Sequence, residues 1–382
     1  MKKIDILGLH LGFGGTEQAI INQANMLCDK YEVRLVVTYK LLKESAFPID
    51  ERVKIIYLTS VRPNREQLKT AIKEKKVKKL FSELFYSAKV LKEKFRTMKN
   101  YIKTSDADIF ISSRIEFHKI LKKYAKKTAI LIGEEHRYSL NDKKYLNRIK
   151  KSCSNFDYFV CVSNELAKAY QKLLKTPKCI YIPNALENRT HQVSQLKGKS
   201  IFTVGRLSPE KGFDDAIKIM EKVCKVEKNI KLYIIGDGSE RKKLEKLVSE
   251  KNLEKNVVFC GFKDRNFIEK IALNSSLFLS VSHEESFGTV IIEAGSYGIP
   301  AVIFDSAKGP LEVIKNSENG IIVKNRNIEK AAATIISLLN DEKTLTKMGS
   351  NAQKNAYRYS FDNIKRLWYN LILKSLEENN KV

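Results

Sequence analysis

Two acidic side chains, Glu285 and Glu293, stand in a stretch that passes from an apolar segment through a short polar loop into a helical pattern. Residues 277–282 are typical of the end of a buried strand, and residues 289–297 carry apolar side chains at helical spacing. A helix start is a binding site for an anion, because its backbone N–H groups are free and its dipole favours negative charge. We therefore predict that an anionic group meets the backbone amides of Phe287, Gly288 and Thr289. On spacing alone, two ordinary acids near a helix start are an equal alternative.

Two basic side chains follow another predicted strand, residues 200–205. Arg206 and Lys211 lie in the loop after it. A guanidinium and an ammonium at a strand end can neutralise two phosphates and favour the charge that builds on a leaving pyrophosphate. The alternative is a pair of surface cations in a loop.

The first half of the chain offers a second group of candidates. Gly14 and Gly15 stand between a short strand and a helix, and although they do not fit a dinucleotide fingerprint, they allow a ligand close to the backbone. Arg114 follows a predicted strand at 107–112 and His136 follows another at 128–132, at the strand ends where open α/β sheets bind ligands. A plain turn at the glycines and a structural histidine at 136 are the alternatives.

These residues need a scaffold that holds them at strand ends. Strands alternate with helices in both halves, which favours an α/β fold with parallel sheets. A chain of 382 residues predicts two domains rather than one core. We expect an N-terminal domain at 1–185, a polar linker at 186–199, a C-terminal domain at 200–356, and a closing helix at 357–382.

The motifs resemble those of the retaining glycosyltransferases of family 4. Glu285-Ser-Phe-Gly288, with Glu293 and then Gly298-Ile-Pro300, is similar to their E-x7-E region, and Gly205-Arg-Leu with Lys211-Gly212 to their G-R-L-x-x-x-K-G segment. The resemblance implies the GT-B architecture, in which two Rossmann-like domains face each other across a cleft that holds the donor. It also implies a closing helix that crosses back to the N-terminal domain.

The resemblance implies a role for each candidate. Arg206 and Lys211 would stabilise the leaving diphosphate, while Glu285 would hold hydroxyls of the donor sugar and His136 would orient that sugar. The remaining binding residues would be Glu293 at the ribose, Phe262 and Lys263 at the nucleobase, and Gly14, Gly15 and Arg114 on the phosphate and acceptor side. The donor would be a nucleotide-diphosphate sugar, commonly of uridine, and the acceptor a hydroxyl of a glycan or lipid-linked molecule in surface polysaccharide synthesis. No Asp pair is well placed to bind a metal, so we expect neither metal nor cofactor.

The net charge of +26 is uneven. Residues 1–190 contain 39 Lys and Arg against 20 Asp and Glu, whereas residues 191–382 contain 31 against 24. Residues 65–103 alone hold 13 cations and four acids, with an apolar stripe at helical spacing from Val77 to Ile102. This segment predicts either surface helices packed on a sheet or a basic face on an anionic membrane. Without a long apolar run or paired cysteines, we expect a cytoplasmic protein that is peripheral to the membrane.

Two other functions stay open at this stage. A sugar-nucleotide epimerase on the same fold would also use His and carboxylates, but without this order of motifs and without an acceptor. A non-catalytic basic protein would bind a membrane surface through charge. Nucleic acid is not expected as a partner, because no recognised module accompanies the charge.

Overall fold

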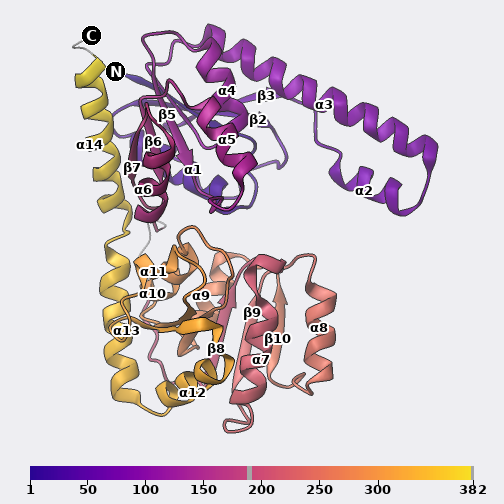
Figure 1. Cartoon of the computed structure of the whole chain (residues 1–382), viewed down its shortest axis with the longest axis vertical. Helices are drawn as coiled ribbons and strands as arrows, with labels where there is room; N and C mark the ends of the chain where they lie inside the picture. Colours follow the sequence, from indigo (N-terminus) through magenta and orange to yellow (C-terminus); the bar gives the residue numbers. More distant parts are fainter. Residues whose placement is uncertain (187–191, 380–382) are drawn as a thin grey trace. The chain divides into compact units, whose positions relative to one another are not determined.

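The computed structural model of the chain describes residues 1–186 and 192–379 (Figure 1). They form two compact units. Unit 1 comprises Met1–Val162, Leu166–Ile182 and the chain from Ile364 onward, and unit 2 comprises Ser163–Glu165 and Pro183–Asn363. Residues 187–191 of the predicted linker, and residues 380–382 of the predicted closing helix, lie outside the described residues.

Unit 1 contains a seven-stranded sheet in the order β3-β2-β1-β4-β5-β6-β7, and every neighbouring pair is parallel. The strands are β1 (Lys3–Gly8), β2 (Glu32–Tyr39), β3 (Lys54–Thr59), β4 (Ile109–Ser112), β5 (Ile130–Glu135), β6 (Tyr158–Cys161) and β7 (Lys178–Tyr181). The helices are α1 (Gly15–Leu27), α2 (Arg65–Lys73), α3 (Val77–Thr104), α4 (Ile115–Tyr124), α5 (Lys143–Ser152), α6 (Asn164–Leu173) and most of α14 (Phe361–Asn379).

Unit 2 contains a six-stranded parallel sheet in the order β10-β9-β8-β11-β12-β13. The strands are β8 (Ser200–Val204), β9 (Lys231–Ile235), β10 (Val257–Gly261), β11 (Leu277–Ser280), β12 (Ala301–Phe304) and β13 (Gly320–Val323). The helices are η1 (Pro209–Lys211), α7 (Phe213–Val223), α8 (Arg241–Glu250), α9 (Arg265–Leu273), α10 (Thr289–Ser296), α11 (Pro310–Val313), η2 (Lys324–Arg326), α12 (Ile328–Leu339) and α13 (Glu342–Tyr357).

In each sheet the order of the strands reverses at one point. In unit 1 the first strand, β1, lies between β2 and β4, and in unit 2 the first strand, β8, lies between β9 and β11. This is the Rossmann-like arrangement, and ligands bind outside the carboxyl ends of the strands at such a switch point. The predicted α/β class with two parallel Rossmann-like sheets is therefore confirmed.

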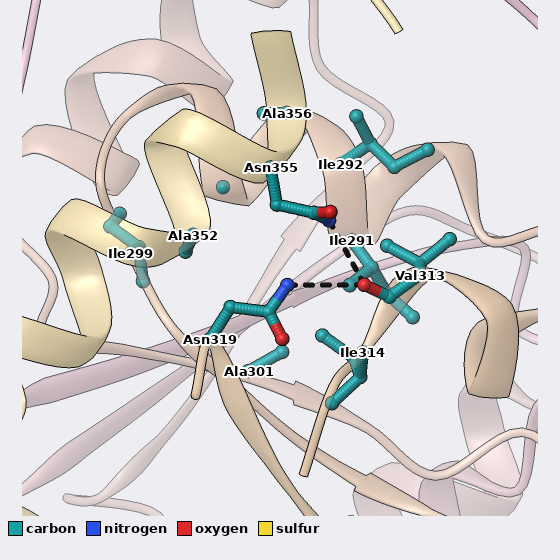
Figure 2. Close-up of a pocket in the computed structure, with 11 residues that line it drawn as sticks. Ile291, Ile292, Ile299, Ala301, Val313, Ile314, Asn319, Ala352, Asn355 and Ala356 are labelled. Carbon is teal, nitrogen blue, oxygen red and sulfur yellow. Dashed lines mark hydrogen bonds between the residues drawn. The ribbon is translucent and has the colours of Figure 1, made fainter. Parts of the chain in front are cut away.

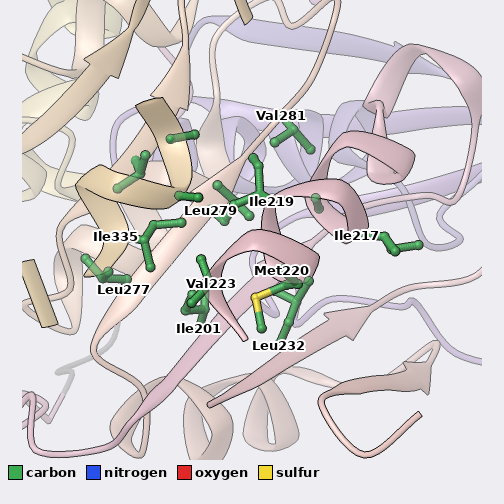
Figure 3. Close-up of a cluster of buried hydrophobic side chains, with 14 of the residues drawn as sticks. Ile201, Ile217, Ile219, Met220, Val223, Leu232, Leu277, Leu279, Val281 and Ile335 are labelled. Atoms are coloured by element: carbon green, nitrogen blue, oxygen red, sulfur yellow. The ribbon is translucent and has the colours of Figure 1, made fainter. Parts of the chain in front are cut away.

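A hydrophobic core fixes the strands of unit 2 beneath their functional loops. Figure 3 shows Ile201, Leu232 and Leu279 of the sheet against Met220 of α7 and Ile335 of α12. All five side chains are almost completely buried. Each such burial contributes roughly 1.5–3 kcal/mol, so the strand ends are rigid supports.

Two expected elements differ from the observed ones. β5 was expected to end at Ile132, but it continues to Glu135, because the buried carboxylates at its end are satisfied by hydrogen bonds within unit 1. The closing helix was expected from residue 357 onward, but α13 ends at Tyr357 and α14 begins at Phe361. From Ile364, α14 belongs to unit 1, where the Tyr369 hydroxyl donates to the Met26 carbonyl at 3.0 Å.

The apolar stripe expected on residues 77–102 is not a single packing face. The stripe has eight members, of which only the last two are buried: Val77, Phe81, Leu84, Ala88, Leu91, Phe95, Met98 and Ile102. The reason is visible in Figure 1, where α3 continues well past the sheet of unit 1, so its outer turns have no sheet to cover.

No helix in residues 1–186 or 192–379 combines the length and apolar character that crossing a membrane requires. All six cysteines are free thiols.

Candidate active site

The switch point of unit 2 brings together two residues that are 74 positions apart in the chain. Lys211 follows β8 and Glu285 follows β11, and the Lys211 ammonium is paired with the Glu285 carboxylate. Their side chains are 23% and 19% exposed, so the pair is sheltered but reachable from solvent. The structure thus joins two of the predicted catalytic residues, which the sequence could place only in separate motifs.

Backbone contacts hold the two loops against each other. The His283 N–H donates to the Glu210 carbonyl at 2.8 Å, which ties the loop after β11 to the short helix η1. Gly212 has a φ of +64°, and an added Cβ would lie 2.5 Å from the Val281 carbonyl oxygen. Any other residue at position 212 would displace the loop that carries Val281. Glycine therefore lets the chain turn directly after Lys211.

Arg326, which the sequence did not indicate as a site residue, holds the same loop through hydrogen bonds to its backbone. Its guanidinium donates to the Val281 carbonyl at 2.9 Å and to the Ser282 carbonyl at 3.2 Å, and it pairs with Asp215 at 2.5 Å. Burial opposes ionisation of Asp215, but hydrogen bonds from Lys218 and Arg326 lower its pKa overall. Nothing in the sequence around Arg326 signals this role, since Val281, Ser282 and Asp215 lie 44 or more positions away.

The start of α10 lies directly after Glu285. Gly288 precedes the helix with a φ of +95°, and the first described intrahelical donors to its carbonyl are Ile291 and Ile292. The amides at 288 and 289 therefore stand at the open N-terminus of the helix. The Phe287 side chain is buried against Tyr359 at 5.4 Å between ring centroids, so only its backbone is available to a ligand.

The other predicted residues of unit 2 lie around this centre rather than in it. Arg206 is 74% exposed and pairs with Glu210 at 3.2 Å. Glu293 pairs with Arg265 at 3.4 Å. Phe262 and Lys263 are both exposed on the segment after β10, where a flat ligand could stack without disturbing the core.

The switch point of unit 1 also carries a cation and a carboxylate. The Arg114 guanidinium, after β4, pairs with Glu17 of α1 at 2.7 Å, and His10 lies 3.9 Å from the same carboxylate. Burial lowers the pKa of His10, an effect that Glu17 partly offsets. At Gly14 an added Cβ would lie 2.2 Å from the Glu17 carboxylate, so a larger residue would displace the end of that side chain. Gly15, in contrast, faces open space.

His136 lies next to a buried carboxylate at the end of β5. Its Nε2 is 3.6 Å from Glu134, whose other oxygen accepts a hydrogen bond of 2.9 Å from Gln23. The neighbouring Glu135 accepts hydrogen bonds from the Tyr170 hydroxyl and the Arg137 N–H, yet burial still raises its pKa. Successive residues of a strand point to opposite faces of the sheet. Glu134 therefore contacts His136 on one face, and Glu135 makes its hydrogen bonds on the other.

Glu17, His10 and Glu134 were all missed as site residues. Glu17 is an acid in the first turn of a helix, which is a common arrangement, and Glu134 was expected in a loop. The only available signal was their position near the carboxyl ends of strands of a parallel sheet.

One enclosed space behind α10 is not a ligand site. Its volume is about 10 Å³, enough for one water molecule, and most of the residues that line it are apolar. Figure 2 shows that Asn319 and Asn355 both point at the Val313 carbonyl, to which they donate at 3.1 and 2.9 Å. These contacts hold α13 in place behind α10. Across residues 1–186 and 192–379, no three His, Cys, Asp or Glu side chains gather as metal ligands would.

Comparison with known sequences points to one class of protein. Residues 185–355, which include the whole switch point of unit 2, match the family described as glycosyl transferases group 1. An exopolysaccharide phosphotransferase from Streptomyces coelicolor is 28% identical over 94% of this chain, but the chain spans only 39% of that protein's length. A poly(ribitol-phosphate) α-N-acetylglucosaminyltransferase from Staphylococcus aureus is 33% identical over 45% of this chain and 35% of its own length.

A third relative matches from end to end. It is an N-acetylgalactosaminyltransferase from Campylobacter jejuni, named for a glycan linked through diphosphate to undecaprenol, and it is 24% identical over 97% of this chain and 98% of its own. Together with the group 1 match, these relatives support the prediction of a glycosyltransferase enzyme.

Solved structures agree on the fold. Sucrose-phosphate synthase from Thermosynechococcus elongatus superposes with a TM-score of 0.80 at 15% identity, covering 99% of this chain and all of the other. A mutant of TarM from S. aureus, in complex with UDP and two sugar ligands, gives 0.77 at 19% identity, covering 97% and 99%. The chain thus has the GT-B fold that the motifs led us to expect.

Proposed function

We propose that this protein is a retaining glycosyltransferase that moves a sugar from a nucleotide-diphosphate donor to a hydroxyl of a glycan or lipid-linked acceptor. The observation that carries the proposal is the Lys211–Glu285 pair at the switch point of unit 2. This is the position where an open α/β sheet binds its ligand, and it lies inside the region that matches glycosyl transferases group 1. Its chemistry suits a substrate with both phosphates and sugar hydroxyls.

In this proposal unit 2 handles the donor. Lys211 turns from Glu285 toward the diphosphate, assisted by Arg206 and by the amides at the start of α10, and neutralises the charge that grows on the leaving group. Glu285 accepts hydrogen bonds from hydroxyls of the donor sugar. Glu293 does the same for the ribose, and the exposed Phe262 and Lys263 contact the base.

Unit 1 handles the acceptor and the reacting sugar. Gly15 leaves room for a ligand beside the backbone, and Gly14 lies under the Glu17 carboxylate that fixes Arg114. His136, supported by Glu134, orients the transferred sugar.

The chemical step forms a bond between the acceptor oxygen and the anomeric carbon as the bond from that carbon to the phosphate oxygen breaks. The acceptor hydroxyl proton passes to the departing phosphate on the same face, so the anomeric configuration is retained. The positive charges and amides of unit 2 stabilise the diphosphate without a metal ion or cofactor.

Uridine diphosphate is the nucleotide we propose for the donor. The TarM complex contains UDP, and a structure of Anabaena HepE, with a TM-score of 0.73 at 18% identity, contains UDP and glucose. The name of the Campylobacter relative supports a lipid-linked acceptor in polysaccharide or glycoconjugate synthesis.

The test is slow hydrolysis of a panel of nucleotide-diphosphate sugars, with a chelator present, by the protein and by Glu285→Ala. We expect one donor to be cleaved to the nucleoside diphosphate, and the substitution to abolish cleavage. Val226→Ser, at an exposed position of unit 2 remote from the pair in sequence, is the control and should cleave at the normal rate. Equal cleavage by Glu285→Ala would contradict the proposed site.

The product of the same assay separates other reactions. The Streptomyces relative is named a phosphotransferase, and transfer of a sugar together with its phosphate would release a nucleoside monophosphate instead. An epimerase would convert the sugar of the donor into its epimer without needing an acceptor. Release of nucleoside diphosphate with a retained anomeric product supports glycosyl transfer alone.

A further inference from the structure

Unit 1 carries a projecting helical hairpin that takes no part in the proposed transfer site. We call residues 65–96, which comprise α2 and the outer part of α3, the arm. In Figure 1 α3 runs well past the sheet, with α2 folded back beside its outer half. Asn64 secures the base of this hairpin, because its amide donates to the Glu83 carbonyl at 2.9 Å and accepts from the Ser87 hydroxyl at 2.8 Å.

One face of α3 is already used for packing. Met98 and Ile102 are buried on the inner turns, beyond the arm. Within the arm Val90 is buried, and Asn64 contacts Glu83 and Ser87 on the same side of the helix. With about 100° per residue, these contacts point in directions that leave another side of the helix toward solvent.

That solvent side is apolar. Six side chains fall within an arc of about 80° on the helix, which makes a continuous stripe five turns long. They are Val77, Phe81, Leu84, Ala88, Leu91 and Phe95. Phe81 is 69% exposed and Leu91 52%, and Phe85, at the edge of the stripe, is 78% exposed. An exposed apolar patch of this kind marks a binding surface.

Positive charge borders the stripe on one side. Lys78, Lys89 and Lys92 lie beside it and form no ion pair with any residue that the structure describes. The few acids of the arm are already engaged, since Glu66, Glu74 and Glu93 pair with Lys69, Lys76 and Arg96 at 2.8–2.9 Å. A partner must therefore offer an apolar interior and an anionic surface together.

We propose that the arm binds an anionic lipid surface, with the stripe from Val77 to Phe95 buried at the level of the acyl chains. An interfacial helix combines these features, and lysine side chains reach from its edge to the headgroups. A second copy of the chain would bring two rows of lysines together, which is unfavourable. A nucleic acid would neutralise the lysines but leave the phenylalanines in water. The inference goes beyond the proposed transferase function and does not depend on it.

The experiment measures binding of the full chain to vesicles of phosphatidylcholine, with and without about one third phosphatidylglycerol. We expect binding to the anionic vesicles only. Phe81→Ser with Phe85→Ser should weaken it by at least about tenfold, and Lys78→Glu, Lys89→Glu and Lys92→Glu together by at least about 30-fold. Because all five side chains are exposed, the variants should keep the melting temperature and donor hydrolysis of the wild type.

Matched controls stand in unit 2. Val226→Ser, and Lys225→Glu with Lys228→Glu and Lys242→Glu, change similar exposed side chains away from the arm and should alter binding less than about twofold. Equal losses in both sets would show general electrostatics and overturn the proposal. So would a wild-type dimer that the paired serine substitutions dissociate without any lipid binding, or tight binding to duplex DNA that ignores them. Donor hydrolysis reports the transfer site separately, so either proposal can fail alone.

Discussion

The two switch points of the molecule use the same kind of ion pair in opposite order. In unit 1 the carboxylate of Glu17 follows the first strand, β1, and the cation Arg114 follows β4. In unit 2 the cation Lys211 follows the first strand, β8, and the carboxylate Glu285 follows β11. Both pairs thus span the gap where the strand order reverses, but they sit in different surroundings.

The surroundings differ in how freely each pair could accept a ligand. Glu17 is almost fully buried, it lies against the Gly14 backbone, and it is shared by Arg114 and His10. The unit 2 pair is about one fifth exposed on both sides and is carried by loops held through backbone contacts. A partly exposed pair can exchange one partner for a ligand at small cost, whereas a buried carboxylate that loses its cation is penalised. We therefore propose a ligand-binding role for Lys211 and a supporting role for Arg114.

The largest expected effect comes from removing the cation of unit 2. Lys211→Met keeps the length of the side chain but loses the charge that, in our proposal, faces the leaving diphosphate. We expect turnover of the cleaved donor to fall by about 100-fold or more. Steady-state kinetics measure it, with Lys225→Met as a control at an exposed position. A fall of less than threefold would remove Lys211 from the site.

A pH series tests the support beneath the unit 1 switch point. His118 is fully buried, its Nε2 lies 2.6 Å from the Ser112 carbonyl at the end of β4, and burial lowers its pKa to about 4. The unfolded chain, with a normal histidine pKa near 6.5, binds the proton first as the pH falls. The free energy of unfolding should therefore have its full value above pH about 6.5, and it should fall by about 3 kcal/mol as the pH approaches about 4.

Urea unfolding across that range measures the slope. His118→Gln should lack this part of the pH dependence, while His283→Gln, at an exposed position of unit 2, should keep it. The same slope in all three proteins would show that His118 is not the titrating group.

Removing one member of the Arg114–Glu17 pair should lower the free energy of unfolding without weakening donor binding. Arg114→Met leaves the buried Glu17 carboxylate without its cation, and we expect the free energy of unfolding to fall by about 2 kcal/mol. Arg114→Met with Glu17→Gln should recover part of that loss, because the uncompensated charge is gone. A single variant as stable as the wild type would mean that the pair is not the support described above.

The smallest effect is expected at the exposed edge of the unit 2 site. Arg206 pairs with Glu210, and such surface pairs contribute roughly 0–1 kcal/mol. Glu210→Gln should therefore change the free energy of unfolding by less than about 0.5 kcal/mol, as measured by urea titration. Arg206→Ala should lower turnover, since the guanidinium itself faces the donor in our proposal. Equal turnover in Arg206→Ala and the wild type would limit the site to Lys211.

The sequence indicated both members of the ion pair in unit 2 but only Arg114 of the pair in unit 1, for a physical reason. Around Lys211 and Glu285, the glycines, the strand ends and the helix start all leave local signals, so a motif can be read without knowing the fold. In unit 1, Glu17 and Glu134 become special only because distant elements bury them. No local pattern distinguishes a buried acid from one in a solvated first turn or loop.

The arm shows the opposite limitation. Its period and charge were evident, but a helical stripe is equally consistent with packing and with a second, exposed face. Only the structure separates the side of the arm that holds Val90 from the side that holds Phe81 and Leu91, and only it shows that the stripe is buried at Met98 and Ile102 alone. Arg326 is similar, because its three loop and helix partners are brought to it by the sheet.

The most direct test of the comparison is calorimetric binding of uridine diphosphate to the full chain and to two folded variants. We predict that Lys211→Met weakens binding by at least about tenfold, whereas Arg114→Met changes it by less than about twofold. Equal weakening by both variants, or a loss only with Arg114→Met, would contradict the assignment of the donor to the switch point of unit 2.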